Sequence, residues 1–98
     1  MVVVKDLLTL FMFSVDLPEE LLNLEFEENY AFHELDIEEK DGSSIAYHVF
    51  KTMPDDDNNC FKLKIDHLEN TISHLKLEGD EIVSGEIYNN EGKIINEI

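Results

Sequence analysis

An acidic loop between two segments expected to be strands has the spacing of a calcium-binding loop. Asp55, Asp57 and Asn59 occupy the first, third and fifth places of such a loop, and Asp66 occupies the twelfth. The match fails at the sixth place, where Cys60 replaces the usual glycine, and at the twelfth, where Asp is shorter than a bidentate Glu. We therefore interpret the segment as an ordinary acidic loop, keep a calcium site as an alternative, and predict no metal and no other cofactor.

The residues that most often carry nucleophilic or zinc chemistry are dispersed along the chain. The four histidines, at 33, 48, 67 and 74, have no metal-ligand spacing to one another or to Cys60, the only cysteine. Cys60 follows a run of acidic and amide side chains, and negative charge disfavours the thiolate that a nucleophile needs. No pair among the many carboxylates stands out as acid and base. The sequence predicts a protein that is not an enzyme, with Cys60 as a small apolar residue.

Blocks of carboxylates are the most unusual feature of the sequence. The chain has 98 residues, with 23 Asp and Glu against seven lysines and no arginine, and a formal charge of −16. A small domain needs a charge of magnitude only about 2–8 for solubility, so a further reason for the acidity is expected. Few cations separate the blocks, which suggests that they are not neutralised locally. The residues that we predict to bind a partner are Glu34, Asp36, Glu38, Glu39, Asp55, Asp56, Asp57, Asp80, Glu81 and Glu86.

This charge excludes some partners and favours another. Direct nucleic-acid binding and attraction to an anionic membrane both need clustered Lys and Arg, which the chain lacks. A basic nucleic-acid-handling protein or nuclease fits instead. On a strand, carboxylates at 34, 36 and 38 recur every ~6.6 Å, about twice the ~3.4 Å rise per phosphate of a DNA strand. Such a row could take the place of phosphates.

In size and charge the chain resembles several classes of small acidic inhibitor: phage anti-restriction and anti-CRISPR proteins, uracil-glycosylase inhibitors, and immunity partners of nuclease toxins. The resemblance is one of composition, and no motif assigns the chain to one class. It implies an inhibitor that covers a basic channel or active site, with aromatic residues flanked by acids, such as Tyr30, Phe32 and Tyr47, as anchors or as core. The alternative is a small homo-oligomeric structural or assembly protein, for instance of phage origin, pairing through residues 7–13 or 93–98.

The length fits one domain, residues 1–98. A lone cysteine, the absence of a secretory leader pattern, and an apolar run at 7–13 that is too short to cross a bilayer indicate a cytoplasmic protein.

Periodicity predicts an α+β fold, with N-terminal short helices packed on an antiparallel β-sheet meander of about five strands. Residues 1–24 are expected to be mainly helical, with Asp6 and Asp16 as helix caps and Pro18 in a first turn. Residues 31–98 are expected to be β-rich, since apolar and polar residues alternate. Asp41-Gly42 predicts a tight hairpin turn, and Phe61, Leu63 and Ile65 are expected to point inward on the clearest strand.

Overall fold

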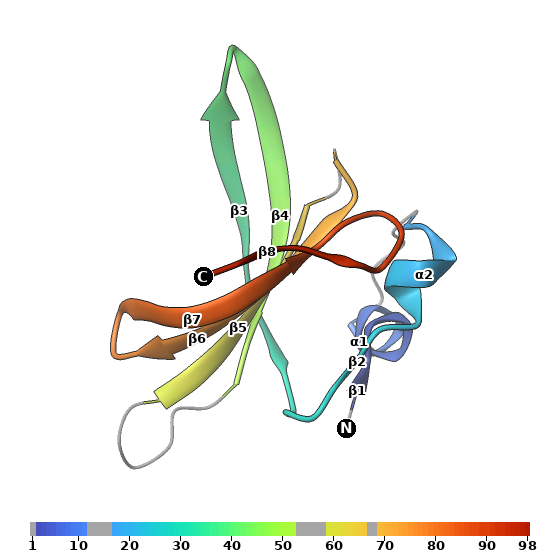
Figure 1. Ribbon diagram of the computed structural model, residues 1–98, viewed down its shortest axis with the longest axis vertical. Coiled ribbons are helices and arrows are strands. Elements are labelled where there is room, and N and C mark those ends of the chain that lie inside the picture. Colours follow the sequence, from blue (N-terminus) through green and yellow to red (C-terminus); the bar gives the residue numbers. More distant parts are fainter. Residues whose placement is uncertain (1, 12–16, 53–58, 67–68) are drawn as a thin grey trace.

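The chain forms a six-stranded antiparallel sheet with a small N-terminal layer on one face (Figure 1). The computed structural model describes residues 2–11, 17–52, 59–66 and 69–98. The sheet contains β3 (Ala31–Lys40), β4 (Ser43–Lys51), β5 (Asn59–Asp66), β6 (Thr71–Glu78), β7 (Glu81–Tyr88) and β8 (Ile94–Glu97), in that order. The N-terminal layer contains β1 (Val2–Val3), α1 (Val4–Leu10), α2 (Glu19–Leu22) and β2 (Glu25–Phe26). The protein is a small α+β fold that is mostly β, and its main sheet has six strands rather than about five.

The predicted hairpin turn at Asp41-Gly42 is confirmed. The ladder between β3 and β4 begins at the pair Lys40 and Ser43, next to the turn, and ends at Ala31 and Lys51. The two residues of the turn have positive φ, 52° at Asp41 and 79° at Gly42. Positive φ at both central positions is the geometry of a type I′ turn, whose twist matches that of the flanking strands. The turn therefore fixes the register of the hairpin and the face on which each side chain lies.

The first helix begins earlier than the sequence indicates. Val3 pairs with Glu25 in the β1–β2 ladder, and the next amide, that of Val4, donates to the Leu24 carbonyl at 3.0 Å. The chain thus passes directly from a strand into α1. Asp6 lies in the first turn of α1 rather than at its cap, so the expectation that Asp6 is the N-cap is wrong.

The second helix is a single turn. Pro18 stands at its N-cap position, one place before the helix that it was expected to enter, and its carbonyl accepts from the amides of Leu21 and Leu22. Asp16, the predicted cap, lies outside the described residues.

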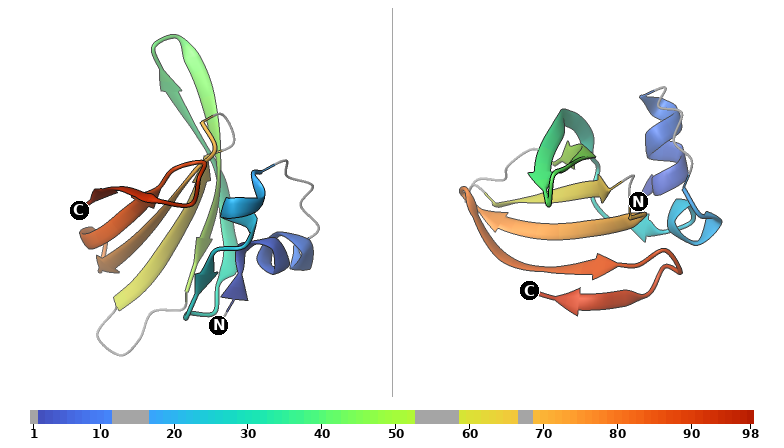
Figure 2. Two further views of the ribbon diagram at one scale, coloured as in Figure 1. Left: turned by 45° about the vertical axis from the view of Figure 1, so that its right-hand side comes forward. Right: turned by 90° about the horizontal axis from the view of Figure 1, so that it is seen from above.

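The core lies between the sheet and the N-terminal layer, and we call the sheet face that contacts this layer the inner face (Figure 2). Leu63 and Ile65 on β5 are fully buried there and Phe61 is half-buried, which confirms the predicted alternation. The other buried members of this core are Val4, Leu7, Leu8, Leu17, Leu21, Phe26, Tyr30, Phe50 and Ile72. The apolar side of α1 is therefore covered by this chain's own sheet.

The opposite, outer face of the sheet has a smaller apolar cluster. Cys60 is buried there with Leu75 and Leu77, as expected for a small apolar residue. Asp66 also lies on the outer face but is buried, 5% exposed, and its carboxylate accepts from the Glu69 amide at 3.1 Å. The carboxylate thereby stabilises the turn that leads into β6.

Candidate functional site

The most elaborate polar cluster surrounds His74, in the middle of β6 on the inner face. The imidazole lies between two phenyl rings. The Phe61 ring is stacked on it, with centroids 5.4 Å apart, and the Phe26 ring covers it at 4.4 Å. The His74 side chain is only 12% exposed. These contacts fix the ring plane, so that its two nitrogens point along the layer between sheet and helices.

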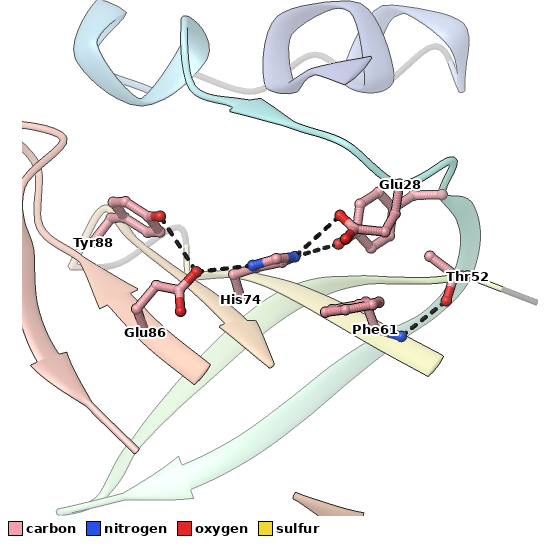
Figure 3. Close-up of polar contacts among 7 residues, drawn as sticks. Glu28, Thr52, Phe61, His74, Glu86 and Tyr88 are labelled. Carbon is pink, nitrogen blue, oxygen red and sulfur yellow. Dashed lines mark hydrogen bonds and ion pairs between the residues drawn. The ribbon is translucent and has the colours of Figure 1, made fainter. Parts of the chain in front are cut away.

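Both nitrogens of His74 have partners (Figure 3). Nδ1 lies 3.0 Å from Oε1 of Glu86, on the neighbouring strand β7. Nε2 lies 2.5 Å from the Tyr30 hydroxyl and 3.7 Å from Oε2 of Glu28. A carboxylate can only accept, so Glu86 selects the tautomer with hydrogen on Nδ1, and Nε2 of a neutral ring then accepts from Tyr30. Tyr88 donates to the same Glu86 oxygen at 3.5 Å.

A hydroxyl that is hydrogen-bonded to an imidazole, which is in turn hydrogen-bonded to a carboxylate, is the arrangement of an activated nucleophile. Here the hydroxyl is unsuited to that role. Burial, followed by the negative charge of Glu28, raises the pKa of Tyr30 far above its ordinary value of 10.0, so the phenol keeps its proton. The arrangement instead joins the segment before β3 to the centre of the sheet. Local patterns in the sequence do not reveal this cluster, because its members come from four separated segments.

A second candidate is the acidic row, which we define as Glu34, Asp36 and Glu38 on β3. These residues pair with Val49, Tyr47 and Ile45 of β4, in the regular part of the ladder between the turn and a bulge at His33, and all three face the outer side of the sheet. Glu34 and Glu38 are exposed and Asp36 is half-buried. β3 is one edge of the sheet, so the row lies along that edge. The structure thus brings these three predicted residues together.

Lysines share the outer face with the acidic row. Lys51 of β4 pairs with Lys62 of β5, and Lys64 of β5 pairs with Val49, the residue opposite Glu34. The pKa of Lys62 is lowered by burial, then by Lys64 and Lys51, while Glu34 and Asp36 act in the opposite direction. The block at 34–39 therefore has lysines near it on the next two strands. The counter-charge lies towards the middle of the sheet, and the carboxylates occupy its edge.

Tyr47 stands between the two sets of charges. The Lys64 ammonium lies 4.2 Å from the centroid of its ring, a cation–π contact. Burial, and then a hydrogen bond to Glu38, raises the pKa of Tyr47 to about 12. Of the other proposed anchors, Tyr30 is buried in the core, and Phe32 packs on Phe50 while remaining partly exposed.

The remaining predicted partner-binding residues lie elsewhere. Glu39 is exposed on β3 but points to the inner side, and Asp80 and Glu81 are exposed at the β6–β7 turn. That turn is at the opposite end of the molecule from the β3–β4 turn (Figure 1). Glu86 is half-buried on the inner face, where its carboxylate accepts a hydrogen bond from Nδ1 of His74. Asp55, Asp56 and Asp57 lie outside the described residues. The other two proposed calcium ligands, Asn59 and Asp66, lie at opposite ends of the extended strand β5.

Within the described ranges, no group of three or more His, Cys, Asp or Glu side chains is arranged to hold a metal ion. No helix in the described part of the chain is long and apolar enough to cross a membrane. Comparison of the chain with protein-family models, with curated proteins and with solved structures finds no match.

Proposed function

We propose that this chain is an acidic protein-binding inhibitor that occludes the basic nucleic-acid-binding surface or active site of a nuclease or other DNA- or RNA-handling protein. In this proposal it resembles the phage anti-defence, DNA-mimic and immunity proteins in its mode of action. It works by binding and not by catalysis. The observation that carries the proposal is the acidic row on the β3–β4 hairpin, which projects beyond the other strands (Figure 1, Figure 2).

The position of the row suits contact with a large partner. A projecting hairpin can enter a channel that the body of the sheet could not enter. Same-face carboxylates repeat at about 6.6 Å along the strand, which allows several cations of a phosphate-binding surface to be engaged at once. Opposite charges also steer the encounter and raise the association rate, an effect that salt weakens.

The test is low-salt capture of a partner, followed by kinetics with two triple variants of equal charge change. One variant replaces Glu34, Asp36 and Glu38 by Lys, and the control makes the same change at Glu78, Asp80 and Glu81 of the β6–β7 turn. The captured protein should be a nucleic-acid-handling enzyme that the wild-type chain inhibits. The row variant should slow association by about tenfold or more, and the turn variant should slow it by less than about threefold. Equal effects of the two variants would contradict a role for the hairpin.

A second candidate function, a small homo-oligomeric assembly protein, is favoured by the opposite edge of the sheet. Exposed apolar side chains gather on β7 and β8 and at the C-terminal residue: Ile82, Val83, Ile94, Ile95 and Ile98. We propose this edge, and not residues 7–13, as the contact in that case, because Leu7 and Leu8 are already buried. Sedimentation over a range of concentrations, with Ile95→Lys as the disrupting variant, tests this alternative.

A further inference from the structure

The β3–β4 hairpin has a second feature besides its acidic row. Leu35 and Ile37 alternate with the acidic residues and lie on the inner side of β3, opposite His48 and Ala46. Because the hairpin extends past the N-terminal layer, these side chains are 53% and 63% exposed. One side of this strand is therefore acidic and the other apolar.

The backbone of β3 is also open along one edge. β3 has β4 on one side and, among the described residues, no strand on the other. In a two-residue hairpin the pair nearest the turn, Lys40 and Ser43, is hydrogen-bonded, and bonded and non-bonded pairs then alternate. The N–H and C=O groups of Leu35 and Ile37 consequently point away from β4, where another strand could bond to them.

We infer that β3 accepts an extended segment of a basic partner as an added strand, in which Lys or Arg alternates with apolar residues. The inference rests on the proposed function and specifies how the partner is held. In an added strand, side chains also alternate at the same repeat, so each cation would face one of Glu34, Asp36 and Glu38 while the apolar residues cover Leu35 and Ile37. Hydrogen bonds between the two backbones supply the affinity, and the alternation of cationic and apolar side chains supplies the selectivity for this partner segment.

A second copy of this chain is a poorer occupant of the same edge. In a two-fold antiparallel pairing of β3 with itself, Asp36 would face Asp36, and Glu34 would face Glu38 of the other copy. Like charges directly opposite one another on a sheet destabilise the pairing. The charge row therefore opposes self-association while favouring a basic strand.

The test uses two blocked peptides of identical composition, the alternating Lys-Val-Lys-Thr-Lys-Val-Lys and the permuted Lys-Lys-Lys-Lys-Val-Thr-Val. The alternating peptide should bind about tenfold more tightly or better, and should slow hydrogen exchange at the Leu35 and Ile37 amides of the wild-type chain. Equal affinities, or exchange unchanged at both amides, would overturn strand addition.

Two variants of one residue separate backbone bonding from charge. Ile37→Pro removes an outward-pointing N–H without changing the charge or a bond to β4, and proline is accepted at such edge positions. It should weaken binding of the alternating peptide by about tenfold, whereas Ile37→Val should keep the affinity within about threefold. If Ile37→Pro does not fold, strand addition is decided by hydrogen exchange at the Leu35 and Ile37 amides of the wild-type chain.

The outcomes distinguish this inference from the proposed function. If inhibition of the captured enzyme is lost in the Glu34, Asp36 and Glu38 variant but unaffected by Ile37→Pro, the partner is held by charge alone and strand addition is wrong. If neither change affects inhibition, the proposed site itself is wrong. A dimer of the free protein that Ile37→Pro dissociates would assign the edge to a second copy and overturn the basic partner.

Discussion

The hydroxyl of Tyr30 lies 2.5 Å from Nε2 of His74, which joins the start of β3 to the centre of a strand 44 residues further along the chain. The same imidazole is held by Glu86 on its other nitrogen and by aromatic rings on both faces. This bond attaches the segment between β2 and β3 to the centre of the sheet, at the border of the apolar core.

His74→Ala should lower the free energy of unfolding by about 2–4 kcal/mol. It removes a ring packed against Phe26 and Phe61, together with the hydrogen bonds that the imidazole makes to the Tyr30 hydroxyl and the Glu86 carboxylate. Urea unfolding measures the change. The matched control is His33→Ala, whose ring is 44% exposed and should cost less than about 0.5 kcal/mol. Equal losses in the two variants would show that the cluster does not support the fold.

Stability should fall as the pH rises above 10. The pKa values of Tyr30, Tyr47 and Tyr88 are all raised by burial above the ordinary 10.0. Above pH 10 the unfolded chain therefore loses phenolic protons that the folded chain keeps. The stability that the three protonated phenols contribute is complete below pH 10 and is lost as the pH rises through their pKa values in the folded state.

Near-ultraviolet absorbance of tyrosinate, followed together with circular dichroism, tests this expectation. Tyr30 should ionise only when the sheet unfolds, whereas Tyr47 should titrate near its raised pKa of about 12. Full ionisation of all three tyrosines around pH 10, with the dichroism of the folded chain intact, would contradict the burial of Tyr30.

Gly85→Ala should destabilise the protein by about 1–3 kcal/mol through overpacking. A Cβ at Gly85 would lie 2.6 Å from the backbone oxygen of His74 and 2.9 Å from Cδ2 of Leu75. The backbones of β6 and β7 would have to separate beside the His74 cluster. Ser84→Ala, one residue earlier, is the control and should change the melting temperature little. A Gly85→Ala protein as stable as wild type would mean that the two strands can separate at no cost.

Added salt should raise the melting temperature. A formal charge of −16 favours the expanded chain through self-repulsion, which counterions screen. The variant with Lys at 34, 36 and 38 loses three negative charges and gains three positive ones, so its net charge is less negative and its melting temperature should rise less over the same salt range. A melting temperature that is independent of salt would indicate that the lysines of the outer face already balance the acidic row.

Local sequence signals predicted much of the sheet. Alternation at Phe61, Leu63 and Ile65 placed β5, and Asp41-Gly42 placed the hairpin turn, because both features depend on neighbouring residues. The bulge at His33 was not predicted, although it places Phe32 and Glu34, two residues apart, on opposite sides of the sheet. Sequence order gives the alternation of side chains but not the point where an extra residue is inserted.

The candidate sites were less predictable for the same reason. The acidic row was predicted, since its members are two residues apart on one strand. The lysines beside it lie on two other strands, and Glu86 was expected at the surface although its partner is His74. Contacts between distant segments depend on strand register, which the residue pattern alone did not give.

The order of strands in the main sheet also bears on how the chain folds. Each pairing in it joins strands that follow one another in sequence, so the sheet can grow by successive local hairpins with small losses of loop entropy. The N-terminal layer differs, because the contact of Phe26 in β2 with His74 in β6 spans more than forty residues. We therefore expect hairpin formation to precede docking of this layer, and closure of the long loop that ends at His74 to be the slower step.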